Sequence, residues 1–256
     1  MRKLAVVALA GILTLVVTAI AIAASETSGT TVQNYEQTYT AKKPKKSTGT
    51  SFSTSSTDES NTAKNKQPKR VTNFDIKFPV GSKIDSKAAP QCKADENDFA
   101  SEDNPDDACP KGSKIGSGEV GARLPINGTG DLKGTVRAYN ANKGLLLFVQ
   151  VDAPGAAQTL LIKPKFSGLN LKTKVPVTCL PPGTPQNGCK DAQGNAQEVV
   201  LTNFELKTKA VKDKKTKRQL ITTPPTCPSG GWTFTASLKY ADGSSVKIPS
   251  KASCSR

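Results

Sequence analysis

From Val71 onward, apolar and polar residues alternate along the chain with a period of two. Phe74, Ile76 and Phe78 are separated by polar residues, and residues 232–240 repeat the pattern. This is the period of a β-strand, in which successive side chains point to opposite faces of a sheet. No segment sustains the spacing of an amphipathic helix. The sequence therefore predicts an all-β domain.

Turn sequences separate further strand-like runs. Asp242-Gly243 lies between two such runs and predicts a hairpin. Residues 145–149, Leu-Leu-Leu-Phe-Val, are apolar on both faces, which indicates a central strand covered on each side. Many short strands joined by Gly- and Pro-rich turns favour a two-sheet β-sandwich, Ig-like or jelly-roll-like, and we expect about eight to ten strands. The other predicted strands are residues 114–124, 132–139, 145–151, 159–166, 171–178, 199–210 and 219–222.

Six cysteines lie in this predicted domain. An even number in an exported protein indicates three disulfides, for which 15 pairings exist. We favour sequential pairing, and for the last pair there is a geometric reason: a turn at Asp242-Gly243 places Cys254 near Gly231, a few residues from Cys227. A thiolate metal site would need clustered pairs such as C-x-x-C, which the sequence lacks. The favoured disulfides are Cys92–Cys109, Cys179–Cys189 and Cys227–Cys254.

The first 24 residues have the pattern of a secretory signal peptide. Arg2 and Lys3 precede an uncharged run, residues 4–24, that ends in small residues. We expect cleavage near Ala23 or Ala24, which leads to a secreted or cell-envelope-associated protein. The run is also long enough to span a bilayer, so an uncleaved N-terminal anchor is the alternative, and it would be the chain's one contact with a membrane.

Residues 25–70 have the composition of a disordered linker. Positions 25–68 hold 18 Ser and Thr in 44 residues, with few aromatic side chains and a basic patch at 42–46. Such a segment buries too little apolar surface to offset the entropy lost on ordering. We therefore expect a flexible tether, with the β-sandwich domain spanning residues 71–256.

Acidic residues concentrate between Cys92 and Cys109. Seven acids and Lys93 give this acidic loop, residues 92–109, a net charge of −6. A closed loop of carboxylates resembles the oxygen-rich environment that Ca²⁺ prefers, but the spacing does not match an EF-hand. A solvated loop is the favoured interpretation and a Ca²⁺ site the alternative; otherwise no cofactor is expected. The candidate ligands are Asp95, Asp98, Asp103, Asp106 and Asp107.

A second stretch has the opposite charge. Seven bases and Asp213 give it a net charge of +6 between two strand-like runs, which predicts a long hairpin with a basic tip. Charged tips can simply guard a sheet edge against pairing. The functional alternative is a patch for anionic polymer such as phosphate-bearing wall glycans or lipid head groups. Its bases are Lys207, Lys209, Lys212, Lys214, Lys215, Lys217 and Arg218.

The chain contains no histidine, which excludes Ser-His-Asp, Cys-His and His-zinc chemistry. Ser244 and Lys247 satisfy S-x-x-K, but the partner motifs S-D-N and K-T-G are absent. We therefore expect a protein that is not an enzyme, with a His-independent hydrolase in the acidic loop as a minor alternative. The formal net charge is +15, yet no aromatic residues interleave with the lysines and no nucleic-acid motif is present, so nucleic acid is not expected as a partner.

Two segments resemble a recurring pattern in exported, uncharacterised β-rich proteins of high-GC soil actinobacteria. Residues 89–92, Phe99 and residues 109–118 follow P-x-C … C-P-x-x-S-x-[IV]-G. Residues 223–243 carry G-W-T-F-T and Y-A-D-G, similar to the closing hairpin of those proteins. The resemblance implies secretion and a disulfide-stapled β domain, and it supplies no catalytic or binding residue.

Together these features predict a non-enzymatic structural or adhesive module. Its expected partner is an anionic cell-wall polymer or an envelope protein, contacted through residues 42–46 and the basic hairpin. The alternative is self-association, in which the acidic loop of one molecule docks on the basic hairpin of the next.

Overall fold

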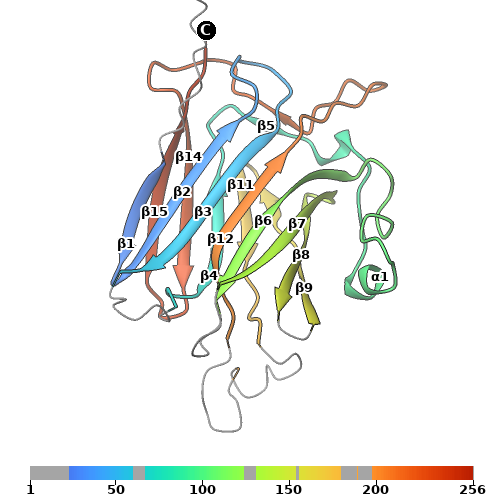
Figure 1. The fold of residues 1–256 in the computed structure, drawn as a ribbon. Helices are drawn as coiled ribbons and strands as arrows, with labels where there is room; N and C mark the ends of the chain where they lie inside the picture. Colours follow the sequence, from blue (N-terminus) through green and yellow to red (C-terminus); the bar gives the residue numbers. More distant parts are fainter. Residues whose placement is uncertain are drawn as a thin grey trace, which may run out of the picture.

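The chain folds into a nearly all-β structure, as the alternating pattern predicts (Figure 1). A computed structural model describes residues 23–59, 67–123, 131–153, 156–179, 189 and 198–255. The described strands are β1 (Ala24–Ser28), β2 (Thr31–Tyr39), β3 (Thr50–Asp58), β4 (Val71–Lys77), β5 (Lys83–Ile84), β6 (Lys114–Arg123), β7 (Leu132–Ala141), β8 (Gly144–Ala153), β9 (Ala156–Ile162), β10 (Lys165–Ser167), β11 (Asn170–Lys174), β12 (Val200–Thr208), β13 (Ile221–Thr222), β14 (Trp232–Tyr240) and β15 (Ser245–Ala252). Two short helices, η1 (Ser86–Ala88) and α1 (Glu96–Ala100), complete the described elements.

Both layers of the sandwich belong to one antiparallel sheet. Its strand order is β1-β2-β3-β12-β6-β7-β8-β10-β11-β4-β14-β15, and β9 pairs with β8. The sheet folds over at β8 and β10, so that β4 and β14 lie opposite β2 and β3. At the far side, the Gln37 backbone N–H donates to Ser250 Oγ at 2.9 Å, which brings β15 back beside β2. The predicted all-β sandwich is confirmed, with one continuous sheet in place of two separate ones; β5 and β13 form a small second sheet.

The prediction of a disordered tether is wrong for the described part of residues 25–70. Strands β1, β2 and β3 lie in this segment, and β3 pairs with β12. Tyr35 and Tyr39 point into the core at 1% and 6% exposure, and Phe52 joins them from β3. The low aromatic content of this segment suggested that it could not form part of a core. Its three aromatic side chains all lie at inward positions, however, and they pack against apolar side chains of β4 and β14. The described part of the domain therefore includes β1, β2 and β3, and the described residues form 15 strands instead of eight to ten.

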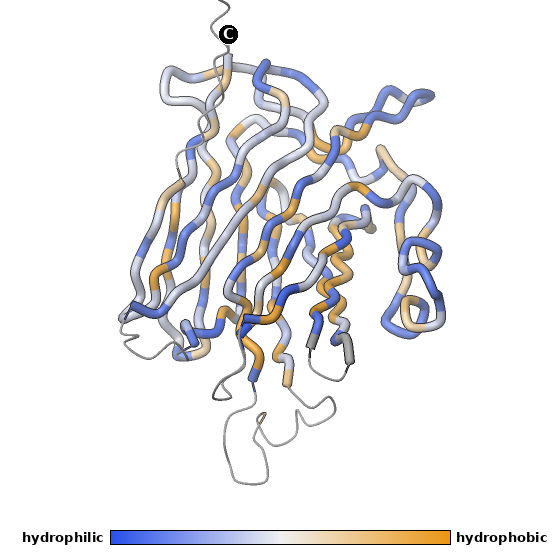
Figure 2. The backbone as a smooth tube through the Cα atoms, in the orientation of Figure 1, coloured by the Kyte–Doolittle hydropathy of each residue, from blue (hydrophilic) through white to orange (hydrophobic). Residues whose placement is uncertain are grey.

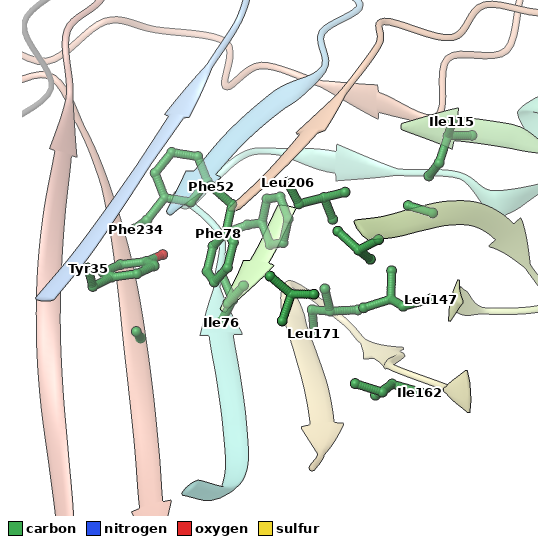
Figure 3. Close-up of a cluster of buried hydrophobic side chains, with 14 of the residues drawn as sticks. Tyr35, Phe52, Ile76, Phe78, Ile115, Leu147, Ile162, Leu171, Leu206 and Phe234 are labelled. Atoms are coloured by element: carbon green, nitrogen blue, oxygen red, sulfur yellow. The ribbon is translucent and has the colours of Figure 1, made fainter. Parts of the chain in front are cut away.

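Aromatic side chains from the two layers meet in the main core (Figure 3). The Tyr39 ring of β2 lies 4.8 Å from the Phe234 ring of β14, measured between centroids. The Phe52 ring of β3 lies 5.4 Å from the Phe74 ring of β4 in an edge-on arrangement. Such tilted contacts are favoured by the ring quadrupoles. They join the N-terminal strands to the layer opposite.

The three disulfides have the sequential pairing that the sequence favours. The Cα–Cα distances are 5.0 Å for Cys92–Cys109, 5.2 Å for Cys179–Cys189 and 5.8 Å for Cys227–Cys254. The geometric argument for the last pair holds to within one residue, because β14 and β15 form the predicted hairpin and Trp232 pairs with Ala252. Three disulfides are typical of a protein that matures in an oxidising environment.

Strand β8 is covered on both faces, as its uninterrupted apolar run predicts. Leu147 and Val149 point into the main core, whereas Leu146 and Phe148 belong to a second cluster on the outer face. The acidic loop covers that outer face: the Phe99 ring stacks on the Phe148 ring at a centroid distance of 4.6 Å. The covering element is thus a loop and not a third layer of sheet.

Several predicted strands differ in their ends. The run 159–166 is divided into β9 and β10 around Pro164, which has no N–H to donate to a neighbouring strand. The run 171–178 ends as β11 at Lys174, and 219–222 contains only the two residues of β13. Helix α1 was not predicted, because a single turn has no periodicity to detect.

The described residues contain no helix that is long and apolar enough to cross a membrane. Nearly all of the predicted signal peptide, residues 1–22, lies outside the described residues. The tube in Figure 2 shows hydrophobic segments along the strand centres and hydrophilic colour in many of the loops that project from them, including the basic hairpin.

Candidate functional site

The structure joins the two lysine-rich segments that the sequence separates by about 160 residues. The loop between β2 and β3 carries four lysines; the end of β12 and the hairpin that follows it carry seven bases. Backbone and side-chain hydrogen bonds hold the two segments against each other. We call the combined patch the basic surface; it consists of Lys42, Lys43, Lys45, Lys46, Lys207, Lys209, Lys212, Lys214, Lys215, Lys217 and Arg218.

The contacts between the segments involve main-chain groups. The Lys46 N–H donates to Thr223 Oγ1 at 2.9 Å, and the Thr223 N–H donates to the Lys46 carbonyl at 3.0 Å. Ser47 Oγ donates to the Val211 carbonyl at 3.2 Å. Gly49 packs so closely on the Thr208 carbonyl that a Cβ atom would overlap it. Because main-chain groups and the Thr223 and Ser47 hydroxyls make these bonds, they do not involve the lysine side chains.

The hairpin itself has a defined tip. Lys212 and Gln219 form an isolated bridge, and the Asp213 N–H donates to the Arg218 carbonyl at 2.9 Å. The Asp213 carboxylate accepts hydrogen bonds from the backbone N–H groups of Thr216 and Lys215, which lower its pKa. The single acid of the hairpin therefore shapes the turn from which the neighbouring cations project.

All eleven cations of the basic surface are solvent-exposed. Within the described part of the chain, Arg218 is the hairpin cation with an ion pair, its Nε lying 3.8 Å from Asp85 Oδ2. Clustered cations repel one another and create a positive electrostatic potential that attracts anions. The lysine ammonium groups are hydrated point charges suited to phosphate, without the fixed fork geometry of arginine.

Sequence reasoning missed Lys83 as a neighbour of this surface. Strand β5 pairs with β13, which puts Lys83 opposite Thr222 at the base of the hairpin. Lys83 is exposed. No local signal could have revealed this, because the two-residue pairing joins positions 139 residues apart.

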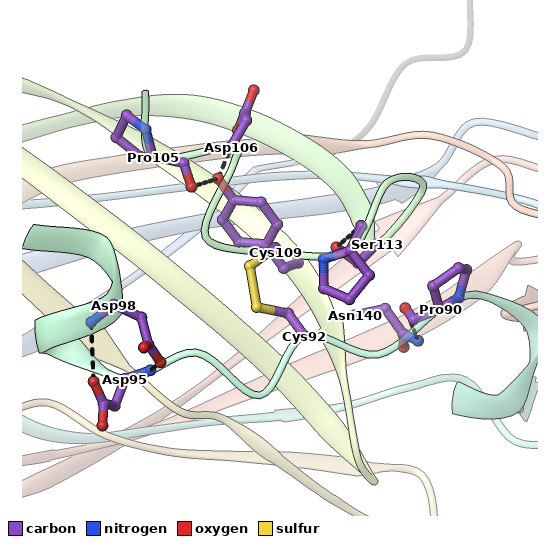
Figure 4. Close-up of a disulfide and its surroundings, with 11 residues drawn as sticks. Pro90, Cys92, Asp95, Asp98, Pro105, Asp106, Cys109, Ser113 and Asn140 are labelled. Atoms are coloured by element: carbon purple, nitrogen blue, oxygen red, sulfur yellow. Dashed lines mark hydrogen bonds between the residues drawn. A yellow bond between two sulfur atoms is a disulfide. The ribbon is translucent and has the colours of Figure 1, made fainter. Parts of the chain in front are cut away.

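The acidic loop is anchored to the sheet and not simply solvated (Figure 4). The Cys92 N–H donates to the Asn140 carbonyl at 2.8 Å, and Asn140 Nδ2 donates to the Ala89 and Pro90 carbonyls. Phe99, 3% exposed, fills the outer cluster from α1. The Cys92–Cys109 disulfide closes the loop beneath it.

Two of the candidate Ca²⁺ ligands form the cap of α1. Asp95 Oδ1 accepts hydrogen bonds from the N–H groups of Asn97 and Asp98, and Asp98 Oδ2 accepts one from the Asp95 N–H. This reciprocal capping box satisfies N–H groups that a helix N-terminus otherwise leaves unpaired. Asp95 and Asp98 thus have a structural role.

Asp106 ties the end of the loop to strands β6 and β7. Its carboxylate accepts hydrogen bonds from Lys114 Nζ and the Tyr139 hydroxyl, both at 2.6 Å, and Arg137 Nε lies 3.9 Å away. Partial burial raises the pKa of Asp106, but the hydrogen bonds from Lys114 and Tyr139 outweigh it and hold the pKa below its usual value. Burial, followed by the hydrogen bond to Asp106, raises the pKa of Tyr139.

The remaining candidate ligands do not converge. Asp103 is exposed, and Asp107 Oδ2 accepts a hydrogen bond from Asn104 Nδ2 at 3.2 Å. Among the residues that the structure describes, no group of three or more His, Cys, Asp or Glu side chains is close enough to hold a metal ion.

Comparison with known proteins finds no matching protein-family model, no similar curated protein and no similar solved structure. The candidate site therefore rests on geometry and charge: a basic surface whose backbone is fixed and whose cations face solvent.

Proposed function

We propose that the protein is a secreted, cell-envelope-associated, non-enzymatic module whose basic surface binds an anionic polymer that carries phosphate groups. The observation that carries the proposal is that hydrogen bonds from main-chain groups and from the Ser47 and Thr223 hydroxyls hold residues 45–48 against Val211 and residues 221–224, at the base of the basic hairpin. A surface built in this way exposes a dense array of cations, and the bonds that join its two segments do not involve lysine side chains.

Charge and redox state support the same proposal. The net charge of +15 favours association with polyanions, and three disulfides fit an extracellular address. Binding through exposed lysines depends on screening, because the Debye length falls from about 10 Å at 0.1 M salt to about 3 Å at 1 M. Affinity should therefore decrease steeply as salt is added.

Charge reversal tests the proposal directly. In the triple variant Lys214→Glu, Lys215→Glu and Lys217→Glu, we expect at least a tenfold loss of affinity for inorganic polyphosphate and for purified phosphate-bearing wall polymer, measured by titration calorimetry at low salt. The matched control reverses three exposed strand lysines, Lys133, Lys172 and Lys239, with the same change in net charge.

Comparing the two variants distinguishes binding at the basic surface from attraction that depends only on the net charge of the protein. Equal losses in both would mean that only the net charge matters, and salt-independent binding by the wild-type protein would contradict the proposal. Sedimentation analysis of the free protein at low salt tests the alternative of self-association. If the sedimenting species becomes larger as protein concentration rises, and the hairpin variant abolishes this, the basic surface binds a second copy of this chain.

A further inference from the structure

A cavity of about 160 Å³ lies between the two layers of the sandwich. Its lining runs along the full length of β4 and β12, from Val71 and Val199 at one end to Phe78 and Thr208 at the other. With a rise of about 3.3 Å per residue, the stretch from Val71 to Phe78 is about 23 Å long. The cavity is therefore long and narrow, not compact.

Aliphatic and aromatic side chains dominate the walls. β4, β8, β9 and β12 contribute side chains such as Phe74, Leu147, Leu160 and Leu201. Phe74, Leu160 and Leu201 are only half-buried although they line the interior. The Phe74 ring, for example, lies 5.4 Å from the buried ring of Phe52. These side chains keep accessible surface because apolar atoms do not fill the space beside them.

Several polar side chains that line the cavity on β2, β3 and β12 already have partners. Gln33 Nε2 donates to Thr54 Oγ1 at 2.6 Å, and the Thr50 and Thr208 hydroxyls lie 3.1 Å apart. They therefore add no unpaired polar group for a ligand to satisfy. Among the described residues that line the cavity, Arg70 is the one with a charge, and it forms an ion pair with Glu198 at the end where β4 begins.

We propose that this cavity binds a single unbranched acyl chain, with the polar head group of the ligand at the Arg70 end. An apolar cavity of similar volume is known to stay dry and to hold a small hydrocarbon. A rigid ring would need a compact space, whereas a flexible chain can follow a narrow path.

The test is a chain-length series with delipidated wild-type protein. Hexanoate, octanoate, decanoate and dodecanoate are titrated below their micelle concentrations, with native mass spectrometry to count bound molecules. We expect one molecule per chain and about a fourfold decrease in Kd per added methylene until the cavity is filled. The melting temperature should rise with affinity, because a ligand of the native state stabilises it. A Kd that does not change with chain length overturns the proposal.

A pair of tryptophan variants locates the binding. Leu201→Trp fills part of the cavity, whereas Val80→Trp places the same side chain at a position that is 82% exposed. We expect Leu201→Trp to shorten the longest chain that still gains affinity, and Val80→Trp to bind like wild type. Equal binding by all three proteins would overturn the proposal by placing the ligand on the surface. The wild-type series is decisive on its own if Leu201→Trp does not fold.

Discussion

The acidic loop and the basic surface are both strongly charged, with opposite signs, but they are built in different ways. In the acidic loop, the carboxylates take part in folding: Asp95 and Asp98 cap α1, and Asp106 binds Lys114 and Tyr139. In the basic surface, main-chain groups and the Thr223 hydroxyl make the contacts between segments, and the lysine side chains are exposed.

This difference indicates which cluster has side chains available to a partner. A side chain that holds the fold is not available to a partner without loss of structure. Three acids of the loop are used in this way, whereas among the described cations of the hairpin Arg218 is the one with an ion pair. The basic surface is therefore the stronger candidate for binding, and the acidic loop is a cover for the outer face of β8.

The largest effect is expected in the acidic loop, from Phe99→Ala. Loss of the ring from the outer cluster should destabilise the protein by about 3 kcal/mol, because a buried aromatic side chain is removed and a cavity is left against Phe148. Chemical denaturation measures the global effect, and hydrogen exchange shows whether the loop opens first. If Phe99→Ala is as stable as wild type, the loop does not cover the sheet.

A smaller effect is expected from Asp106→Asn, about 1 to 2 kcal/mol at neutral pH, because hydrogen bonds from Lys114 and Tyr139 to a charged acceptor are weakened. The pKa of Asp106 is lowered in the folded state, so its contribution is complete above the unfolded value near 3.8 and is lost as pH falls through the lower folded value.

Denaturant titrations from pH 7 to pH 2 test this dependence. The stability difference between wild type and Asp106→Asn should shrink below about pH 4, while Asp103→Asn, in the same loop but exposed, should match wild type throughout. A difference that persists unchanged at the lowest pH would show that the charge of Asp106 is not what anchors the loop.

The smallest effect on folding is expected in the basic surface. The triple reversal of Lys214, Lys215 and Lys217 should change the free energy of unfolding by no more than about 0.5 kcal/mol, because these exposed side chains lie away from buried contacts. The same denaturation measurement checks this. A loss comparable to that of Phe99→Ala would mean that the lysines do hold the fold and would remove the contrast with the acidic loop.

Local sequence features predicted much of the β structure. The alternation at Phe74, Ile76 and Phe78 corresponds to β4 and its end, and Asp242-Gly243 forms the turn of the last hairpin. These predictions succeed because strand alternation and short turns depend on neighbouring residues. The prediction for residues 25–70 failed because β2 and β3 depend on partners more than 140 residues away in β12 and β15.

The candidate site also combines features that depend on neighbouring residues with features that depend on distant ones. The sequence identified each lysine-rich segment, but their union depends on Thr223 and Val211 meeting Lys46 and Ser47. The cavity had no sequence signal, since its lining residues have the same apolar character as those of a filled core.

The sequence by itself determined the alternating strands, the closing hairpin and, through that hairpin, which cysteine lies near Cys254, because these features rest on short-range geometry. Only the tertiary structure decided that the N-terminal strands complete the sandwich, that two basic segments form one surface, and that space remains between the layers. Those outcomes depend on how distant strands pair and how tightly opposing faces pack, which residue type alone does not specify.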